Sequence, residues 1–206
     1  MFQILTVCTG NICRSPLAAM ILRTRLSDLD PAVTSAGTRG LAGAPMTPEA
    51  QRLAAELGVA GVAGADAAAH RSRYLTEEHL SVPDLILTMT RDHRRHVVEL
   101  APARMRSTFT VREFARLAGD LSDDGLRAAA SATGSEADAV TALRAAVRAV
   151  AARRGIADPP AAPEDDDVID PYRRPWATYL LSAQQMAPGL AEVERVVRAA
   201  SSRRPR

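Results

Sequence analysis

A cysteine and an arginine six residues apart lie near the N-terminus of this 206-residue chain, in the segment Cys8-Thr-Gly-Asn-Ile-Cys-Arg14. A thiolate is a strong nucleophile, and a guanidinium offers a planar fork that matches two oxygens of a phosphate. The pair could therefore bind a phosphate group and attack its phosphorus. The spacing alone is weak evidence, because the chain has 26 basic residues, all of them arginine. Alternatively, Cys8 is a small buried hydrophobic residue at the end of a strand.

The residues on both sides of this segment predict a strand followed by a helix. Residues 2–7 form an apolar run, which predicts a buried strand that ends at Cys8. Residues 16–27 carry apolar side chains at helical spacing. Pro16 suits the first helical position, and Ser15 is a good N-cap residue. The strand would therefore bring the cysteine to the edge of a sheet, opposite the start of a helix.

The loop between this strand and helix has the residues of an anion cradle. Gly10 and Asn11 tolerate left-handed backbone angles, so the loop can turn its amide hydrogens inward. The positive end of the following helix would face the same hollow. These groups and Arg14 would favour the thiolate form of Cys8 and neutralise the phosphate oxygens without a metal ion. In-line attack by Cys8 would then give a phosphocysteine intermediate.

Strands and helices alternate along the rest of the chain. Further strands are predicted at residues 32–36, 84–89 and 107–111, and helices at 47–57, 91–100, 135–154 and 176–199. Alternating strands and helices are typical of a parallel sheet, in which ligands bind beyond the carboxyl ends of the strands. Residues 176–199 could form one helix, or two helices with a break near the Pro188-Gly189 pair.

The length and the turn residues indicate one domain with an insertion. We expect a domain over residues 1–200, with an inserted helical and acidic segment at about 118–167. Residues 157–167 are rich in proline and aspartate, which predicts a flexible acidic linker. Its acidic end, residues 164–167, could dock a basic partner or could simply be solvated surface. Residues 201–206 are predicted to be a disordered tail.

Composition excludes several classes of protein. Hydrophobic residues make up 47% and charged residues 24%, as in soluble globular proteins, and the net charge of +2 is too small to indicate nucleic-acid binding. Two cysteines are too few for a disulfide framework or an ordinary zinc site. No apolar run approaches the roughly 20 residues of a membrane span, and the N-terminus lacks the features of a signal peptide. We therefore expect a cytoplasmic protein without membrane insertion and without a metal or other cofactor.

The segment from Cys8 to Pro16 closely resembles the signature of the low-molecular-weight protein tyrosine phosphatases. Ser35-Ala-Gly-Thr38, His70-Arg-Ser-Arg73 and Asp84-Leu-Ile-Leu-Thr-Met89 resemble further segments of that family. The resemblance covers most of residues 1–117 and 168–200. It is nearest to bacterial enzymes associated with the tyrosine kinases of capsule and exopolysaccharide assembly. It implies an α/β fold with a four-stranded, parallel, twisted, Rossmann-like sheet and helices on both faces.

The resemblance implies a phosphatase that acts on phosphotyrosine in proteins, with Cys8 as nucleophile and Arg14 as phosphate clamp. A phenolate is a poor leaving group, since tyrosine has a pKa of about 10, so a proton donor is expected. Three Asp-Pro pairs could supply it, at Asp30, Asp158 and Asp170. Only Asp170 stands in an Asp-Pro-aromatic triplet like that of the family, so we assign it as the general acid and base.

The resemblance also assigns supporting roles. The loop and its support would comprise Thr9, Gly10, Asn11, Ile12, Cys13, Ser15, Ser35 and His70. The walls of the substrate slot would be Leu41 and Tyr172. Each role has a simpler alternative. Ser15 could only cap the helix, His70 could be a surface residue, and the two wall residues could pack locally. Cys13 could form a reversible disulfide with Cys8 or be a buried structural thiol.

Three other functions are weighed against this prediction. An arsenate reductase of the same fold would need further cysteines, which the chain lacks. Protein arginine phosphatases tend to carry threonine where this chain has Ile12, and an apolar branched residue should favour a flat phenyl ring. A phosphotyrosine-binding module without turnover would commonly have lost Cys8, Arg14 or Asp170. Phosphotyrosine proteins, among them a bacterial tyrosine kinase, are therefore the predicted partners.

Overall fold

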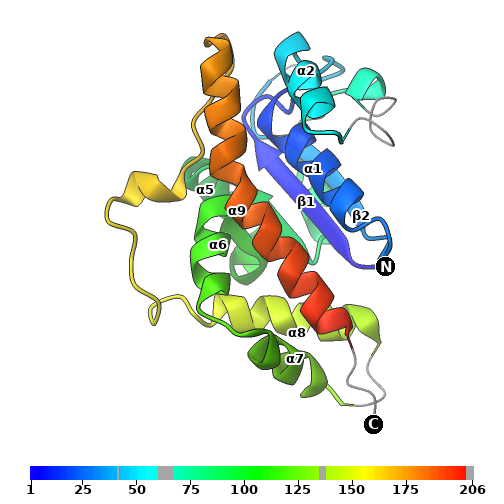
Figure 1. The fold of residues 1–206 in the computed structure, drawn as a ribbon, viewed down its shortest axis with the longest axis vertical. Helices are drawn as coiled ribbons and strands as arrows, with labels where there is room; N and C mark the ends of the chain where they lie inside the picture. The colour runs from blue at the N-terminus through cyan, green and yellow to red at the C-terminus, as the bar shows by residue number, and fades with distance from the viewer. Residues whose placement is uncertain (41, 60–66, 135–137, 203–206) are drawn as a thin grey trace.

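The computed structural model describes residues 1–40, 42–59, 67–134 and 138–202. Four parallel strands form one sheet in the order β2-β1-β3-β4 (Figure 1). The strands are β1 (Gln3–Cys8), β2 (Ala32–Gly37), β3 (Leu85–Thr88) and β4 (Thr108–Thr110). The four-stranded parallel sheet of the α/β class is thus confirmed, and each strand lies within two residues of its predicted bounds.

Helices connect the strands and cover both faces of the sheet (Figure 1). The longer helices among the described residues are α1 (Arg14–Arg25), α2 (Pro48–Glu56), α5 (Arg91–Leu100), α6 (Val111–Gly119), α7 (Asp123–Ser131), α8 (Ala139–Ala151) and α9 (Trp176–Ser201). The short helix α4 (Glu77–Ser81) and the 3₁₀ helices η1 (Pro102–Ser107) and η2 (Pro163–Asp166) complete the connections. Helices α4, α6 and α7 were not predicted from the sequence. Among the described residues no helix is long and apolar enough to cross a membrane.

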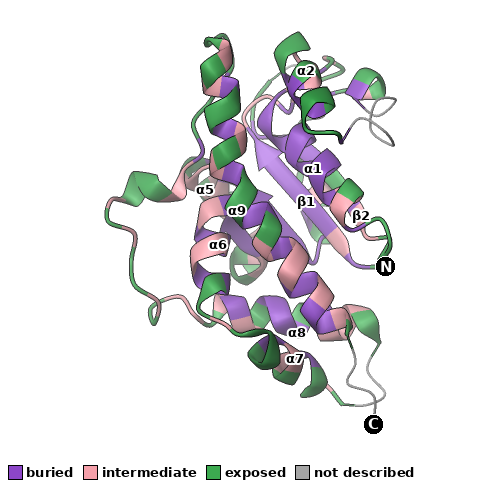
Figure 2. Ribbon diagram, in the orientation of Figure 1, coloured by how far each residue is buried: buried purple, intermediate pink, exposed green. Residues whose placement is uncertain are grey.

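The apolar side chains of the strands alternate between two cores, one on each face of the sheet. Ile4 packs into the larger core, with α1, α6 and α9, whereas Leu5 and Val7 pack into the smaller core, with α4 and α5. Burial on both faces explains why the strands read as continuous apolar runs. Figure 2 shows β1 buried along nearly its whole length.

Helices α7 and α8 belong to the inserted segment and pack beside the C-terminal part of α9 (Figure 1). Their apolar faces join the larger core through Leu126, Leu143, Val147 and Val150. Asp138 caps α8, whose helix therefore begins inside the predicted range of residues 135–154, while 135–137 lie outside the described residues. The division into one domain with an insertion stays a prediction, which this shared core supports.

The C-terminal end of the predicted insertion is held by ion pairs to helices α5 and α6. Asp166 lies 2.9 Å from Arg116 of α6, and Asp167 lies 3.0 Å from Arg91 of α5. The Asp167 carboxylate also accepts a hydrogen bond from the Arg91 backbone amide at 2.7 Å. The prediction of a flexible linker over 157–167 thus differs from the structure at its acidic end, because carboxylates that looked solvated in the sequence have arginine partners on other elements.

Helix α9 runs without a break through Pro188, so of the two arrangements left open by the sequence the single helix is the one observed. A proline inside a helix removes one backbone hydrogen bond and costs about 3 kcal/mol. Burial of Met186, Leu190 and Val193 on both sides of it holds the helix together. Ser201, predicted to begin the tail, is instead the last residue of α9, and residues 203–206 lie outside the described residues.

The crossing of α6 and α9 depends on a close approach at Gly189. A Cβ atom at this position would overlap the backbone carbonyl and the side chain of Val111. Gly189→Ala should therefore destabilise the protein by about 1–3 kcal/mol in urea unfolding, because the helices must move apart. Gly119→Ala is the matched control, since a Cβ there meets no atom within 4 Å and should change stability by less than about 1 kcal/mol. Equal effects of the two substitutions would contradict a close crossing.

Candidate active site

Cys8 is the last residue of β1, and its thiol lies at the carboxyl edge of the sheet. Its Sγ accepts a hydrogen bond from the backbone amide of Asn11 at 3.3 Å and lies 3.0 Å from Ser15 Oγ. Helix α1 begins at Arg14, so its positive end faces the same loop. The loop therefore surrounds the sulfur with groups that stabilise negative charge.

Ser15 does not cap α1, which contradicts one of the two roles predicted for it. The helix begins earlier than residue 16, its N-cap residue is Cys13, and no side chain caps it. The buried Ser15 hydroxyl instead accepts a hydrogen bond from Asn11 Nδ2 at 3.0 Å. That contact leaves the hydroxyl proton for Cys8 Sγ, at 3.0 Å, or for the more distant Ala36 carbonyl, at 3.4 Å. The geometry fits donation to the thiolate.

Asn11 fixes the shape of the loop. Its φ of 55° lies in the left-handed region, which asparagine tolerates better than most residues, whereas Gly10 does not need positive φ. The side chain donates hydrogen bonds to Ser15 Oγ and to Ser35 Oγ at 3.0 and 2.9 Å, and it accepts one from the Arg73 backbone amide at 3.0 Å. The fully buried Asn11 thus joins the loop to β2 and to the segment before α4.

His70 completes this network. Its Nε2 lies 2.7 Å from the carbonyl oxygen of Asn11, and because a carbonyl only accepts, Nε2 is the donor. Burial lowers the pKa of His70 from its ordinary value, so the ring is neutral at neutral pH. Arg73 Nε donates to the Ser35 carbonyl at 2.7 Å, which ties the His70-Arg-Ser-Arg73 segment to β2.

Arg14 lies under the loop with a buried guanidinium. Its Nη1 donates to the Val168 carbonyl at 3.0 Å, and Nη2 donates to Thr9 Oγ1 at 3.3 Å and pairs with the Asp170 carboxylate at 2.8 Å. Nε is buried and has no hydrogen-bond partner in the described part of the chain. A buried cationic donor without a partner is costly, so this arrangement suits an anion that accepts from it.

Asp170 is the one aspartate of the three Asp-Pro pairs that lines the cavity at Cys8. Its side chain is half exposed, in contrast to the buried Arg14 that it contacts. Asp30 lies at the opposite edge of the sheet, before β2, and Asp158 lies in the inserted segment, where its carbonyl accepts from Arg116. The structure therefore brings Cys8, Arg14 and Asp170 to one place, although Asp170 is separated from Arg14 by more than 150 residues.

The cavity above Cys8 has a volume of about 240 Å³. Ile12, Ala44 and Tyr172 contribute apolar surface to its walls, and Gly10 and Cys13 also line it. Tyr172 lines this cavity and is exposed, and its role as a wall of a substrate slot stays a prediction. The other predicted wall residue, Leu41, lies outside the described residues. The cavity can accept a flat apolar group attached to a phosphate.

Cys13 is a free thiol buried near the other side of the loop, and Cys8 is also free. Its Sγ lies 3.5 Å from Thr47 Oγ1 and 4.0 Å from the Tyr179 hydroxyl. Burial raises the pKa of Cys13 to about 11, so it is a neutral thiol at pH 7 and a poor nucleophile. A disulfide between Cys13 and Cys8 stays a prediction.

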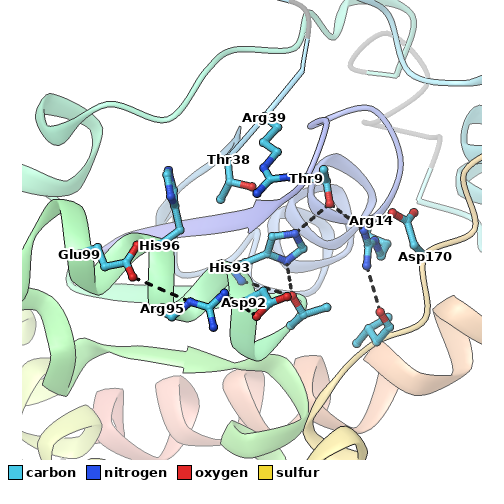
Figure 3. Close-up of a pocket in the computed structure, with 12 residues that line it drawn as sticks. Thr9, Arg14, Thr38, Arg39, Asp92, His93, Arg95, His96, Glu99 and Asp170 are labelled. Atoms are coloured by element: carbon cyan, nitrogen blue, oxygen red, sulfur yellow. Dashed lines mark hydrogen bonds and ion pairs between the residues drawn. The ribbon is translucent and has the colours of Figure 1, made fainter.

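His93 is a site residue that was not identified from the sequence. It lies in the first turn of α5, directly after β3, so its position at the carboxyl edge of a predicted strand was the available signal. Its Nε2 lies 2.9 Å from Thr9 Oγ1, and its Nδ1 lies 2.9 Å from Thr90 Oγ1 (Figure 3). The imidazole thus supports the threonine that accepts a hydrogen bond from Arg14.

Fold and site together bring a cysteine, an arginine and an aspartate to one cavity at the edge of a parallel α/β sheet. The model of the family described as low molecular weight phosphotyrosine protein phosphatase matches residues 3–124, which is more than half of the 206 residues. The chain belongs to this family and is a phosphatase. The matched residues end before Asp170, so the assignment of that residue depends on the geometry of the site.

Curated relatives carry two kinds of name. A protein-arginine-phosphatase of Geobacillus stearothermophilus is 36% identical over 124 residues, which are 59% of this chain and 78% of the relative. The probable low molecular weight protein-tyrosine-phosphatase EpsP of Ralstonia nicotianae is 38% identical over 53% of this chain and 70% of its own. The low molecular weight protein-tyrosine-phosphatase Etp of Escherichia coli is 42% identical over 48% of this chain and 62% of its own.

Solved structures have the same fold. A low molecular weight protein tyrosine phosphatase from T. tengcongensis superposes with a TM-score of 0.61 and 27% identity, over 93% of this chain and 97% of that one. The YwlE arginine phosphatase from Geobacillus stearothermophilus gives a TM-score of 0.60 and 25% identity, over 96% and 92%. Vibrio vulnificus Wzb in complex with benzylphosphonate gives 0.61 at 23% identity, over 92% and 94%, which indicates a shared fold alone.

The buried imidazole of His93 should make stability depend on pH. Burial, together with the nearby Arg14 cation, lowers the pKa of His93 to about 3, whereas an unfolded histidine has a pKa of about 6.5. Between these values the unfolded chain binds a proton that the folded chain does not, so stability falls as the pH falls. From pH 6.5 to 5, the wild type should lose up to about 2 kcal/mol more than His93→Gln in urea unfolding. Equal losses would contradict a neutral, buried His93.

Proposed function

We propose that this protein hydrolyses phosphotyrosine in other proteins through a phosphocysteine intermediate. The observation that carries the proposal is the convergence of Cys8, Arg14 and Asp170 on one cavity. A nucleophile, a cation for the phosphate oxygens and a carboxyl group for proton transfer are the three groups that this reaction requires. Family membership supports the phosphatase activity, whereas the roles of these three residues are our assignment.

In the first step, the Cys8 thiolate attacks phosphorus, and the bond from phosphorus to the tyrosine oxygen breaks. The Arg14 guanidinium and the inward amides of the loop stabilise the charge on the equatorial oxygens. The Asp170 carboxyl group gives its proton to the departing phenolate, which leaves as tyrosine. The sulfur–phosphorus bond that forms is the phosphocysteine. The contact of Asp170 with Arg14, at 2.8 Å, supports its presence within reach of the phosphate.

In the second step, Asp170 acts as the base. It takes a proton from a water molecule while the oxygen of that water attacks the phosphorus. The sulfur–phosphorus bond then breaks. Inorganic phosphate leaves, and Cys8 returns to the thiolate form, which the Ser15 hydroxyl and the Asn11 amide stabilise at 3.0 and 3.3 Å. No metal ion or cofactor takes part in these two steps.

Phosphotyrosine is favoured over phosphoarginine by the composition of the cavity wall. Ile12, Ala44 and Tyr172 line it, and such apolar surface suits a phenyl ring better than a charged guanidinium. The relative from Geobacillus stearothermophilus is nevertheless named as an arginine phosphatase, while EpsP and Etp are named as tyrosine phosphatases. We therefore propose that the substrates are phosphotyrosine proteins, a tyrosine kinase among them. We also propose that the protein is cytoplasmic.

Matched peptides test the substrate class directly. Purified protein, without added metal, is given one peptide sequence carrying phosphotyrosine, phosphoserine or phosphoarginine, with Cys8→Ser beside it. We expect turnover of the phosphotyrosine peptide and its loss in Cys8→Ser, which should still bind phosphate because the loop remains. Preference for phosphoarginine would contradict the role given to Ile12. Binding of the phosphotyrosine peptide without turnover would favour a recognition module.

The role of Asp170 predicts a dependence on the leaving group. Asp170→Asn should lower kcat by about 10²–10⁴-fold for phenyl phosphate, whose leaving group needs a proton. For aryl phosphates whose phenols are acidic, Asp170→Asn should slow the first step much less. The rate of that step is measured as the burst of phenol release. A loss that is equal across the series would show that another group donates the proton. Asp158→Asn is the matched control and should behave as the wild type.

A further inference from the structure

A second cavity, of about 370 Å³, adjoins the proposed catalytic cavity. Four residues line both cavities: Thr9, Arg14, Arg39 and Asp170. Thr38, from the end of β2, and His93, Arg95 and His96, from α5, form other parts of its wall (Figure 3). A protein substrate whose phosphorylated side chain enters the first cavity would therefore bring its neighbouring residues to the second.

The charges in this second cavity are paired, with one exception. Arg14 pairs with Asp170 at 2.8 Å, and Arg95 pairs with Asp92 at 3.0 Å and with Glu99 at 3.8 Å. Arg39 lines both cavities, yet its side chain makes no hydrogen bond or ion pair within the described part of the chain. Its cation is one of the charges that lower the pKa of His93. Arg39 is thus an unpaired positive charge at the boundary between the two cavities.

The backbone of Arg39 is fastened to the phosphate-binding loop. Its amide donates to the Thr9 carbonyl at 2.8 Å, and the Thr38 amide donates to the Cys8 carbonyl at 2.9 Å. Gly40 follows with φ of 127° and lies so close to Gly10 that an added Cβ would be 3.0 Å from its Cα. The backbone of Arg39 is therefore held beside the loop that carries Cys8, and its exposed side chain starts from this place.

We propose that Arg39 forms a subsite for a second anionic group of the substrate, carried by a residue next to the phosphotyrosine. The group would be the carboxylate of a glutamate or aspartate, or a second phosphoryl group, since both accept hydrogen bonds from a guanidinium. The inference rests on the proposed phosphotyrosine activity and adds a preference for acidic sequences. Attraction by an exposed arginine should be modest and should weaken with salt.

Pairs of phosphotyrosine peptides that differ only by glutamate or glutamine test this subsite. The substitution is made at each of the two positions before and after the phosphotyrosine, and kcat/KM is compared within each pair at low salt. At one position or more, the wild type should favour glutamate by roughly threefold to tenfold. Arg39→Gln should reduce that ratio to about one, and Arg39→Lys should keep part of it because the charge remains. Arg106→Gln, which removes an exposed arginine in η1, is the matched control and should keep the whole ratio.

The outcomes separate the subsite from the activity on which it rests. Equal turnover of glutamate and glutamine peptides by the wild type, or an unchanged ratio in a folded Arg39→Gln, would overturn the subsite and leave the phosphatase activity intact. No turnover of any phosphotyrosine peptide would overturn both proposals. A further peptide with phosphoserine at the favoured position distinguishes the sources. Faster turnover than with glutamate would assign the subsite to a second phosphoryl group, and slower turnover would assign it to a carboxylate.

Discussion

The left-handed backbone of Asn11, held by its own side chain, is the constraint on which the site depends. This conformation turns the Asn11 amide toward Cys8 Sγ, while the carboxamide contacts Ser15, Ser35 and Arg73. A conformation that most residues avoid persists only where surrounding contacts stabilise it. Here those contacts come from α1, from β2 and from the segment before α4. These contacts hold the loop in its observed shape without a substrate, which is the condition for stabilising charge without reorganisation.

The second condition is that residues from separate parts of the chain meet at one place, and the parallel sheet provides this. The carboxyl ends of β1, β2 and β3 bring Cys8, Arg39 and His93 to the same edge, although these residues come from separate parts of the chain. The segment that carries Asp170 reaches this edge because Val168 bridges β3 and Arg14. Its amide donates to the Met89 carbonyl at 2.8 Å, and its own carbonyl accepts from Arg14. The ion pair of Asp167 with Arg91 secures the same segment, which gives the acidic end of the insertion a structural role.

The sequence was sufficient where local residue types decide the structure. The strand, the loop with Asn11 and the following helix could be predicted because apolar runs and turn residues act over a few positions. Predictions failed where distant contacts decide. Ser15 is a good helix cap in isolation, but Cys8 and Asn11 compete for its hydroxyl. The sequence left open whether Pro188 divides the last helix, and burial along α9 decides for a single helix. His93 was missed because its contact with Thr9 depends on the order of the strands, and the sequence showed only that it follows a predicted strand.

The covalent intermediate is the central claim, and rapid quenching in acid tests it most directly. The enzyme is mixed with a fast aryl phosphate, quenched within the first turnover, digested and examined by mass spectrometry. We expect a phosphoryl group on the peptide that contains Cys8, formed together with a burst of phenol. It should be more abundant in Asp170→Asn, where hydrolysis of the intermediate is slowed. A burst without phosphate on Cys8, or phosphate on another residue, would contradict the central claim.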